Sequence, residues 1–125
     1  MISLLAIALG GAIGAVLRYL ISTQLNVVIL SSIPVGILFV NILGSLIMGM
    51  TFSIIELNYI KNPVVQKFIT VGILGAFTTF STFSLEVFKL INQGFLANAL
   101  IYSLISVIFS VTFLILGIYI IRLLL

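Results

Sequence analysis

Charged residues are nearly absent from this chain, and this constrains its fold more than any other feature. No charge occurs between Arg18 and Glu56 or between Lys89 and Arg122. Charged residues make up 6% of the sequence, whereas a typical soluble domain carries about 25%. With 63% apolar residues and a mean hydropathy of +1.52, the chain could not cover a water-facing surface. We therefore expect a membrane protein with lipid as its solvent.

The apolar stretches are long enough for four membrane-spanning helices. A helix needs roughly 20 apolar residues to cross a hydrocarbon core about 30 Å thick. Turn-forming residues interrupt the pattern at three places, Asn26 to Pro34, Asn58 to Pro63, and Asn92 to Gly94. We predict an all-α membrane protein with a single domain (1–125) and helices at about 2–22, 34–56, 66–92 and 95–123. The first helix lacks a basic region before it, so we expect it to be retained and not cleaved as a signal peptide.

The residue inventory excludes several function classes. Histidine and cysteine are absent, which removes imidazole bases, thiol chemistry and the usual transition-metal ligands. We expect no enzyme activity, because no paired carboxylates or nucleophile–base arrangement is available. The net charge of +3 is small and scattered, so we expect no nucleic acid partner.

Positive charges are nearly balanced across the membrane. In a four-span protein, both termini and the middle loop share one side, which here holds Lys61, Lys67 and Arg122. The other side holds Arg18 and Lys89. The bias of lysine and arginine sets orientation, and three against two is a weak bias. We therefore predict dual topology and an antiparallel homodimer, unless one lipid-facing arginine or lysine misleads this count.

The first two helices each contain polar residues with two interpretations. Gly10, Gly14 and Arg18 share one face of the first helix, and the glycines permit close helix approach. Arg18 either snorkels to the membrane interface or draws anions into a vestibule. Asn41 lies within an apolar run of the second helix. Its amide either links two helices or donates hydrogen bonds to a passing anion.

The third helix has the densest polar pattern. Hydroxyl residues fill five of the seven positions from Thr78 to Ser84, after two glycines. These side chains compete for backbone hydrogen bonds, so we predict a helix broken near its middle, at Gly75–Thr78. Carbonyls exposed at such a break can hold a cation. Phenylalanine recurs every third residue in one stripe, which usually means packing: Phe77, Phe80 and Phe83.

The fourth helix places Tyr102, Ser106 and Ser110 on one face. This hydroxyl ladder favours a polar track over local hydrogen bonding. Mid-membrane polar groups are thus hydroxyls and one amide, while Glu56 and Glu86 lie toward helix ends. Neutral donors suit a small anion that must be stripped of water, and the electropositive edges of aromatic rings can assist. The pattern indicates anion permeation without identifying the anion.

Three segments carry a resemblance to a known family across the whole chain: Gly10–Arg18, Gly36–Ser45 and, most specifically, Gly75–Glu86 with the string GAFTTFSTFSLE. The sequence resembles the CrcB/Fluc family of small fluoride channels. The resemblance implies a multi-pass protein of the cell inner membrane that passively exports cytoplasmic fluoride. It also implies a dual-topology homodimer with two pores, a structural Na⁺ at the dimer centre, and fluoride resistance as the physiological role.

The resemblance further implies roles for individual residues. The pore and fluoride-binding residues would be Asn41, Phe80, Phe83, Ser81, Thr82, Tyr102, Ser106 and Ser110. Arg18 matches a vestibule arginine and Glu86 an acid at a pore end. The backbone carbonyls of Gly75 and Thr78 match those that hold Na⁺. Two departures are Ile37, where many relatives carry a hydroxyl, and Leu114, where some extend the polar track.

Two other interpretations use the same four helices. A multidrug exporter of this size needs a glutamate inside the first helix, and none occurs there. In a membrane scaffold protein, the hydroxyls and phenylalanines would only pack. The hydroxyl ladder and the string in the third helix argue against the scaffold.

Overall fold

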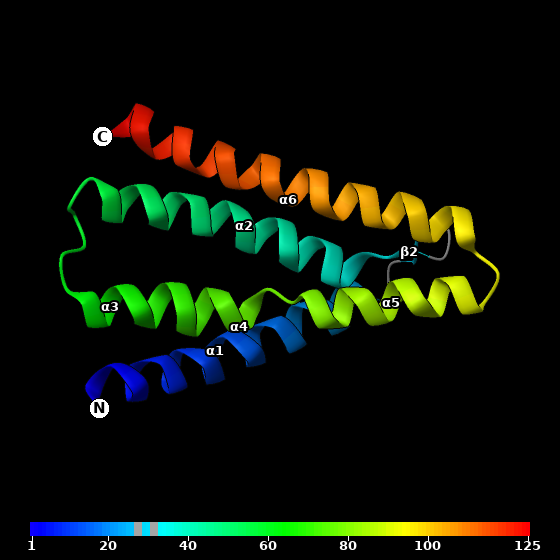
Figure 1. The fold of residues 1–125 in the computed structure, drawn as a ribbon, viewed down its shortest axis with the longest axis horizontal. Coiled ribbons are helices and arrows are strands. Elements are labelled where there is room, and N and C mark those ends of the chain that lie inside the picture. The colour runs from blue at the N-terminus through cyan, green and yellow to red at the C-terminus, as the bar shows by residue number, and fades with distance from the viewer. Residues whose placement is uncertain (27–28, 31–32) are drawn as a thin grey trace.

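The computed structural model describes residues 1–26, 29–30 and 33–125, and helices dominate it (Figure 1). Within this part of the chain, four segments are long and apolar enough to cross a membrane: Ile2–Leu25, Val35–Glu56, Pro63–Asn92 and Leu96–Leu124. Both termini and the loop after the second segment lie at the same end of the molecule, as four crossings require. The predicted membrane protein with four spanning helices is confirmed, and the chain is a multi-pass membrane protein.

Three of the spans are single helices, α1 (Ile2–Leu25), α2 (Val35–Glu56) and α6 (Leu96–Leu124). The third consists of α3 (Pro63–Lys67), the π-helix η1 (Phe68–Leu74), α4 (Gly75–Phe77) and α5 (Phe80–Asn92). Between α1 and α2, the strands β1 (Ile29–Leu30) and β2 (Ile33–Pro34) pair antiparallel, with Ile29 opposite Pro34. The sequence did not predict this short ladder in an otherwise all-α fold. Ser31 and Ser32, two residues of the expected turn, lie outside the described residues.

Two helix boundaries differ from the prediction. α1 continues to Leu25 instead of ending at residue 22, and the Asn26 backbone N–H still donates to the Ser22 carbonyl (2.9 Å). The Thr23 hydroxyl bonds to the Tyr19 carbonyl of the same helix (2.7 Å), so it does not compete with the helix for backbone N–H groups. The third span begins at Pro63, not at residue 66. The Asn62 side chain accepts a hydrogen bond from the backbone N–H two residues on (2.8 Å), and proline is favoured at the first helical position.

Glycines set the closest helix contacts. A Cβ atom at Gly14 would overlap the carbonyl oxygen of Ile73, so α1 rests on the backbone of η1. The close approach predicted for the first helix is therefore confirmed. At the contact between α2 and α6, Gly49 faces the Leu114 carbonyl, and Gly117 faces the α2 backbone in return. These contacts hold α2 against α6 and α1 against the third span.

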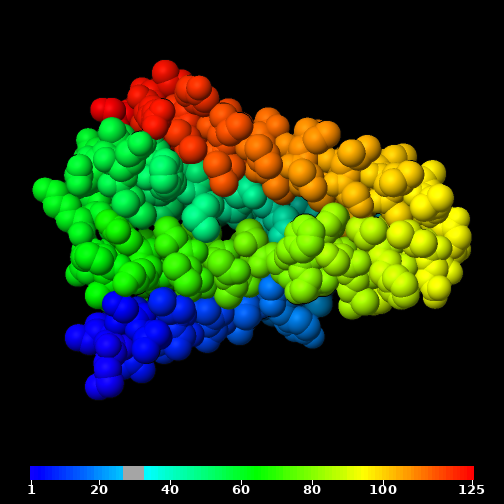
Figure 2. Space-filling view, viewed as in Figure 1, coloured from blue at the N-terminus to red at the C-terminus, as the bar shows by residue number. Residues whose placement is uncertain are grey.

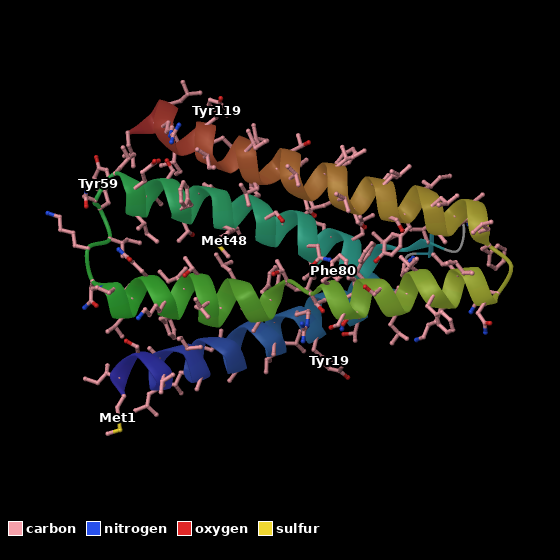
Figure 3. All side chains as sticks on the ribbon, in the orientation of Figure 1. Met1, Tyr19, Met48, Tyr59, Phe80 and Tyr119 are labelled. Atoms are coloured by element: carbon pink, nitrogen blue, oxygen red, sulfur yellow. The ribbon has the colours of Figure 1, made fainter. Side chains whose placement is uncertain are left out.

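Few side chains are buried within the single chain. The core cluster lies where α2, α5 and α6 meet and contains Ile37, Phe83, Leu90, Ala99 and Tyr102. The space-filling view shows one face of the molecule, with a hollow where α2 faces the middle of the third span (Figure 2). Large apolar side chains are exposed on all four spans. Tyr59 and Tyr119 project at the end that holds both termini (Figure 3), where tyrosine suits a membrane–water interface. The remaining exposed apolar surface is available to lipid or to another protein chain.

Candidate ion pathway

The third span loses its helical conformation at two threonines. α4 ends at Phe77 and α5 begins at Phe80. Between them, Thr78 (φ −78°, ψ 154°) and Thr79 (φ −152°, ψ 127°) have extended backbone angles. Figure 1 shows this segment as coil halfway along the span. Because non-helical backbone at membrane depth must find partners inside the protein, the contacts of these two residues matter.

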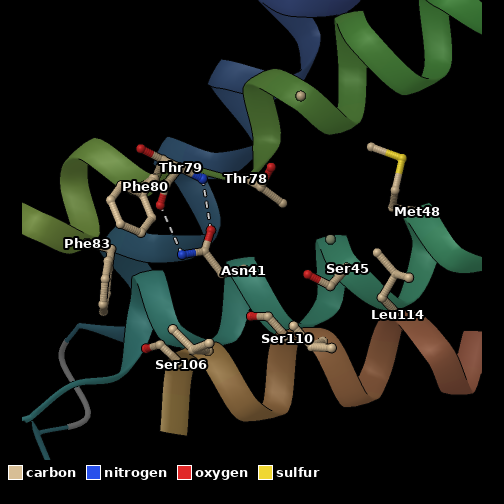
Figure 4. Close-up of a pocket in the computed structure, with 14 residues that line it drawn as sticks. Asn41, Ser45, Met48, Thr78, Thr79, Phe80, Phe83, Ser106, Ser110 and Leu114 are labelled. Atoms are coloured by element: carbon tan, nitrogen blue, oxygen red, sulfur yellow. Dashed lines mark hydrogen bonds between the residues drawn. The ribbon is translucent and has the colours of Figure 1, made fainter. Parts of the chain in front are cut away.

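Asn41 of α2 supplies those partners. Its Oδ1 accepts a hydrogen bond from the Thr79 backbone N–H (2.8 Å), and its Nδ2 donates one to the Thr79 carbonyl (3.0 Å). Figure 4 shows both bonds as dashed lines. Thr79 is buried, so this reciprocal pair replaces the water that an open backbone would need. Nδ2 carries a second hydrogen, for which no acceptor occurs among the described residues.

The Thr79 hydroxyl caps the first turn of α5. It accepts a hydrogen bond from the Thr82 backbone N–H (3.2 Å), which satisfies one of the N–H groups at the start of the helix. It also lies 3.2 Å from the side-chain hydroxyls of Ser81 and Thr82. The two predicted pore residues Ser81 and Thr82 therefore belong to a hydroxyl cluster at the start of α5.

A groove of about 530 Å³ opens beside the interruption. It brings α2, α4, α5 and α6 together, and its wall carries no charged side chain among the described residues. Seven of the predicted site residues line it: Asn41, Gly75, Thr78, Phe80, Phe83, Ser106 and Ser110. Seven residues that were not among the predicted site residues also line it: Gly44, Ser45, Met48, Thr79, Val107, Val111 and Leu114.

Phe80 and Phe83 differ sharply in exposure. Phe80 is 75% exposed and Phe83 is 8% exposed, with their ring centroids 5.4 Å apart at an interplanar angle of 53°. Phe83 also packs against Tyr102 at 5.3 Å. Phe77 does not continue this row, because the extended threonines end the helical spacing and its ring lies against Gly44 instead. The predicted stripe of three phenylalanines was therefore wrong.

The hydroxyl ladder of α6 divides into two parts. Ser106 and Ser110 line the groove, and the buried Oγ of Ser106 has no hydrogen-bond partner among the described residues. Tyr102 is fully buried behind Phe83 and does not line the groove. Its hydroxyl donates to the Glu86 carboxylate (2.5 Å). Leu114 extends the groove wall beyond Ser110 as an apolar surface.

The two residues predicted for the pore mouths lie apart from the groove. Glu86 lines a second cavity of about 220 Å³ with Pro34, Lys89, Leu90 and Gln93. Arg18 is half-buried on α1 and lines neither cavity. In a single chain, Tyr102 therefore stands between the Glu86 cavity and the groove.

Comparison with known proteins assigns the family. The family described as CrcB-like protein, Camphor Resistance (CrcB), matches residues 5–118. The chain belongs to the CrcB family. A relative of this CrcB-family protein from Shewanella piezotolerans, named fluoride-specific ion channel FluC, is 47% identical over 105 residues, 84% of each chain. Another from Nitrobacter hamburgensis, named fluoride-specific ion channel FluC 1, is 43% identical over 121 residues, 97% of this chain and 96% of the relative. These matches confirm the resemblance seen in the sequence.

Sequence reasoning about this CrcB-family protein missed Thr79 as a site residue. Its signal was the pair of adjacent β-branched residues at 78–79, both poor helix formers, which indicated a break without saying which backbone groups would be released. Thr79 contributes its backbone to Asn41 and its hydroxyl to α5. The pairing of Asn41 with a residue 38 positions away could not be found from spacing.

Proposed function

We propose that this CrcB-family protein is a fluoride-selective channel that passively exports cytoplasmic fluoride across the cell inner membrane and so provides fluoride resistance. The observation that carries the proposal is the uncharged groove, lined by the polar residues Asn41, Ser106 and Ser110 beside the exposed Phe80 ring. The FluC name of relatives across more than four-fifths of the chain supports fluoride as the ion. A channel of this kind is not an enzyme.

The groove suits an ion that is small and strongly hydrated. A pore must replace the water around such an ion with hydrogen-bond donors, and conduction also requires that the ion can leave. Serine hydroxyls and an amide are neutral donors, so they replace water without the strong attraction of a fixed positive charge. Aromatic ring edges carry partial positive charge and extend this lining where hydroxyls are absent.

Each site residue has a role in this proposal. Ser106, Ser110, the second Nδ2 hydrogen of Asn41 and the ring edges of Phe80 and Phe83 contact fluoride along the groove. The flanking polar groups that stabilise the path are Ser81, Thr82 and Tyr102. Arg18 attracts anions at one mouth, and Glu86 lies at the other end of the path.

An antiparallel second copy of the chain would complete the pathway. The groove is open along one side, and the 75% exposure of Phe80 leaves an aromatic ring without cover at membrane depth. The nearly equal number of lysines and arginines on the two sides supports insertion in both orientations. Two such grooves, each closed by the partner, would form two pores in the dimer.

A structural Na⁺ fits the backbone at the interruption. Hard cations take oxygen ligands, and carbonyls released from a broken helix can coordinate Na⁺. Gly75 and Thr78 both lie on the groove wall, so their carbonyls are near the face that the second copy would cover. Two carbonyls from each chain would supply four ligands, and the bound charge would favour anions in both pores.

Fluoride efflux from liposomes tests the proposal. Purified protein is reconstituted in KF-loaded liposomes, valinomycin carries the counter-current of K⁺, and an ion-selective electrode records external fluoride; KCl-loaded liposomes test selectivity. We expect fast, valinomycin-dependent fluoride efflux without chloride efflux. Absence of fluoride efflux from a folded dimer would overturn the proposed function and leave the scaffold interpretation. The exporter interpretation is disfavoured, because no carboxylate lies on the groove wall in the described part of the chain.

A further inference from the structure

The hydrogen bonds at the interruption follow a simple rule of helix geometry. In a continuous α-helix, each backbone N–H donates to the carbonyl four residues earlier. The Thr79 N–H would therefore donate to the Gly75 carbonyl, and the Thr82 N–H to the Thr78 carbonyl. In this structure, neither bond forms: the Thr79 N–H donates to Asn41 Oδ1, and the Thr82 N–H donates to the Thr79 Oγ1.

We infer that Asn41 and the Thr79 hydroxyl are positioning residues that create the cation site, because they divert the two N–H groups that would otherwise occupy the carbonyls of Gly75 and Thr78. The inference rests on the proposed Na⁺ site, since it explains why those two carbonyls are released. In this inference, Asn41 positions the backbone of the third span, and this role does not depend on contact with fluoride. The inference also assigns a role to the Thr79 hydroxyl, which faces its own helix terminus.

The contacts around Thr79 indicate that α2 stabilises the non-helical segment of the third span. Asn41 satisfies both the N–H and the carbonyl of this residue, so one side chain offsets the cost of opening the helix. On the neighbouring turn of α2, a Cβ at Gly44 would overlap the Thr78 side chain, so α2 approaches the interruption closely. Figure 4 shows Asn41 and the two threonines facing each other across this contact. α2 therefore holds the third span in its interrupted conformation.

Two substitutions at Asn41 separate positioning from fluoride contact. Asn41→Asp keeps an oxygen that accepts the Thr79 N–H, loses the N–H that donates to the Thr79 carbonyl, and introduces a negative charge on the groove wall. Asn41→Leu has a similar size and removes both hydrogen bonds, so the Thr79 N–H can return to the Gly75 carbonyl. We expect Asn41→Asp to retain the cation site while losing fluoride flux, and Asn41→Leu to lose both.

Two substitutions of Thr79 change less of the molecule than the substitutions of Asn41. Thr79→Val has nearly the same shape and lacks the oxygen that accepts the Thr82 N–H. Thr79→Ser keeps that oxygen and should rescue the site. Ser103→Ala changes a hydroxyl of α6 that bonds back to its own helix outside the groove, and it serves as the control.

The readout is Na⁺-dependent thermal stabilisation of the purified dimer, measured against N-methylglucamine chloride at equal ionic strength. A ligand that binds only the folded state raises the midpoint of unfolding with concentration. Loss of a cap costs about 0.5–2 kcal/mol, so Thr79→Val should raise the Na⁺ concentration for half-maximal stabilisation by roughly two- to thirtyfold. We expect responses like the wild type from Thr79→Ser and Ser103→Ala, and no response from Asn41→Leu.

Each outcome decides the inference. Equal Na⁺ responses in the wild type, Thr79→Val and Asn41→Leu would overturn it, as would a wild-type protein without any Na⁺ response. The expected pattern combined with absent fluoride flux in the wild type would contradict the proposed channel function and leave this inference standing. If Asn41→Leu does not fold, the comparison of Thr79→Val with Thr79→Ser still decides.

Discussion

The Tyr102 hydroxyl donates a 2.5 Å hydrogen bond to the Glu86 carboxylate, which joins α6 to α5 at a point where Tyr102 is fully buried. The Tyr102 ring packs against Phe83 on the side of the groove. One side chain thus links the second cavity, which Glu86 lines, to the wall of the proposed pore.

Tyr102→Phe should lower the free energy of unfolding, because it removes the hydrogen bond and keeps the ring packing. Hydrogen bonds to charged groups contribute about 1.5–3 kcal/mol. A double-mutant cycle with Glu86→Ala, which removes the acceptor, isolates the pair when it is measured by thermal or denaturant unfolding in detergent. Additive effects of the two substitutions would show that the hydrogen bond contributes nothing to stability.

Ser106→Ala should reduce fluoride flux without destabilising the chain. Its Oγ is buried and has no hydrogen-bond partner by distance and angle among the described residues, so its removal should leave the free energy of unfolding unchanged or raise it. Flux should fall, because a donor on the groove wall is lost. Ser103→Ala is the matched control: its hydroxyl bonds back to the Ala99 carbonyl (2.7 Å) away from the groove, and flux should be unchanged. Equal flux in both variants would remove Ser106 from the pathway.

Phe80→Ile and Phe83→Ile should both abolish fluoride flux while the dimer stays intact in size-exclusion chromatography. Their effects on stability should differ. Phe83 is buried against Tyr102, so its change of shape should cost about 1–3 kcal/mol, whereas the exposed Phe80 contributes less to packing within the chain. Phe88→Ile, an exposed position of α5 outside the groove, is the control. Wild-type flux in either of the first two variants would exclude that ring from the pore.

Gly49→Ala should destabilise the protein by about 1–3 kcal/mol, since overpacking forces backbone shifts. The added methyl group would overlap the Leu114 carbonyl oxygen at the contact between α2 and α6. Gly11→Ala is the matched control, because its Cβ would meet no atom of the described chain within 4 Å. Thermal unfolding of both variants checks this, and a similar midpoint for the two would contradict the tight contact.

The sequence by itself determined the solvent, the number of spans and the family. Long uncharged stretches place the chain in lipid, where every backbone polar group must form a hydrogen bond within the protein. Helices of membrane-spanning length follow from that requirement. Local chemistry around Thr78 and Thr79 also pointed to the region where the third span is interrupted. Helix ends were predicted less well, because caps such as Asn62 shift them by a few residues.

Only the tertiary structure decided which polar residues face one another. Asn41 and Thr79 lie 38 positions apart, and Tyr102 reaches Glu86 from a different helix, so neither pair follows from periodicity within one segment. The interruption also ended the helical spacing that placed Phe77 beside Phe80 in the prediction. Hydrogen-bond partners depend on how α2, α5 and α6 pack in three dimensions, and that packing is set by close contacts such as Gly49 against Leu114.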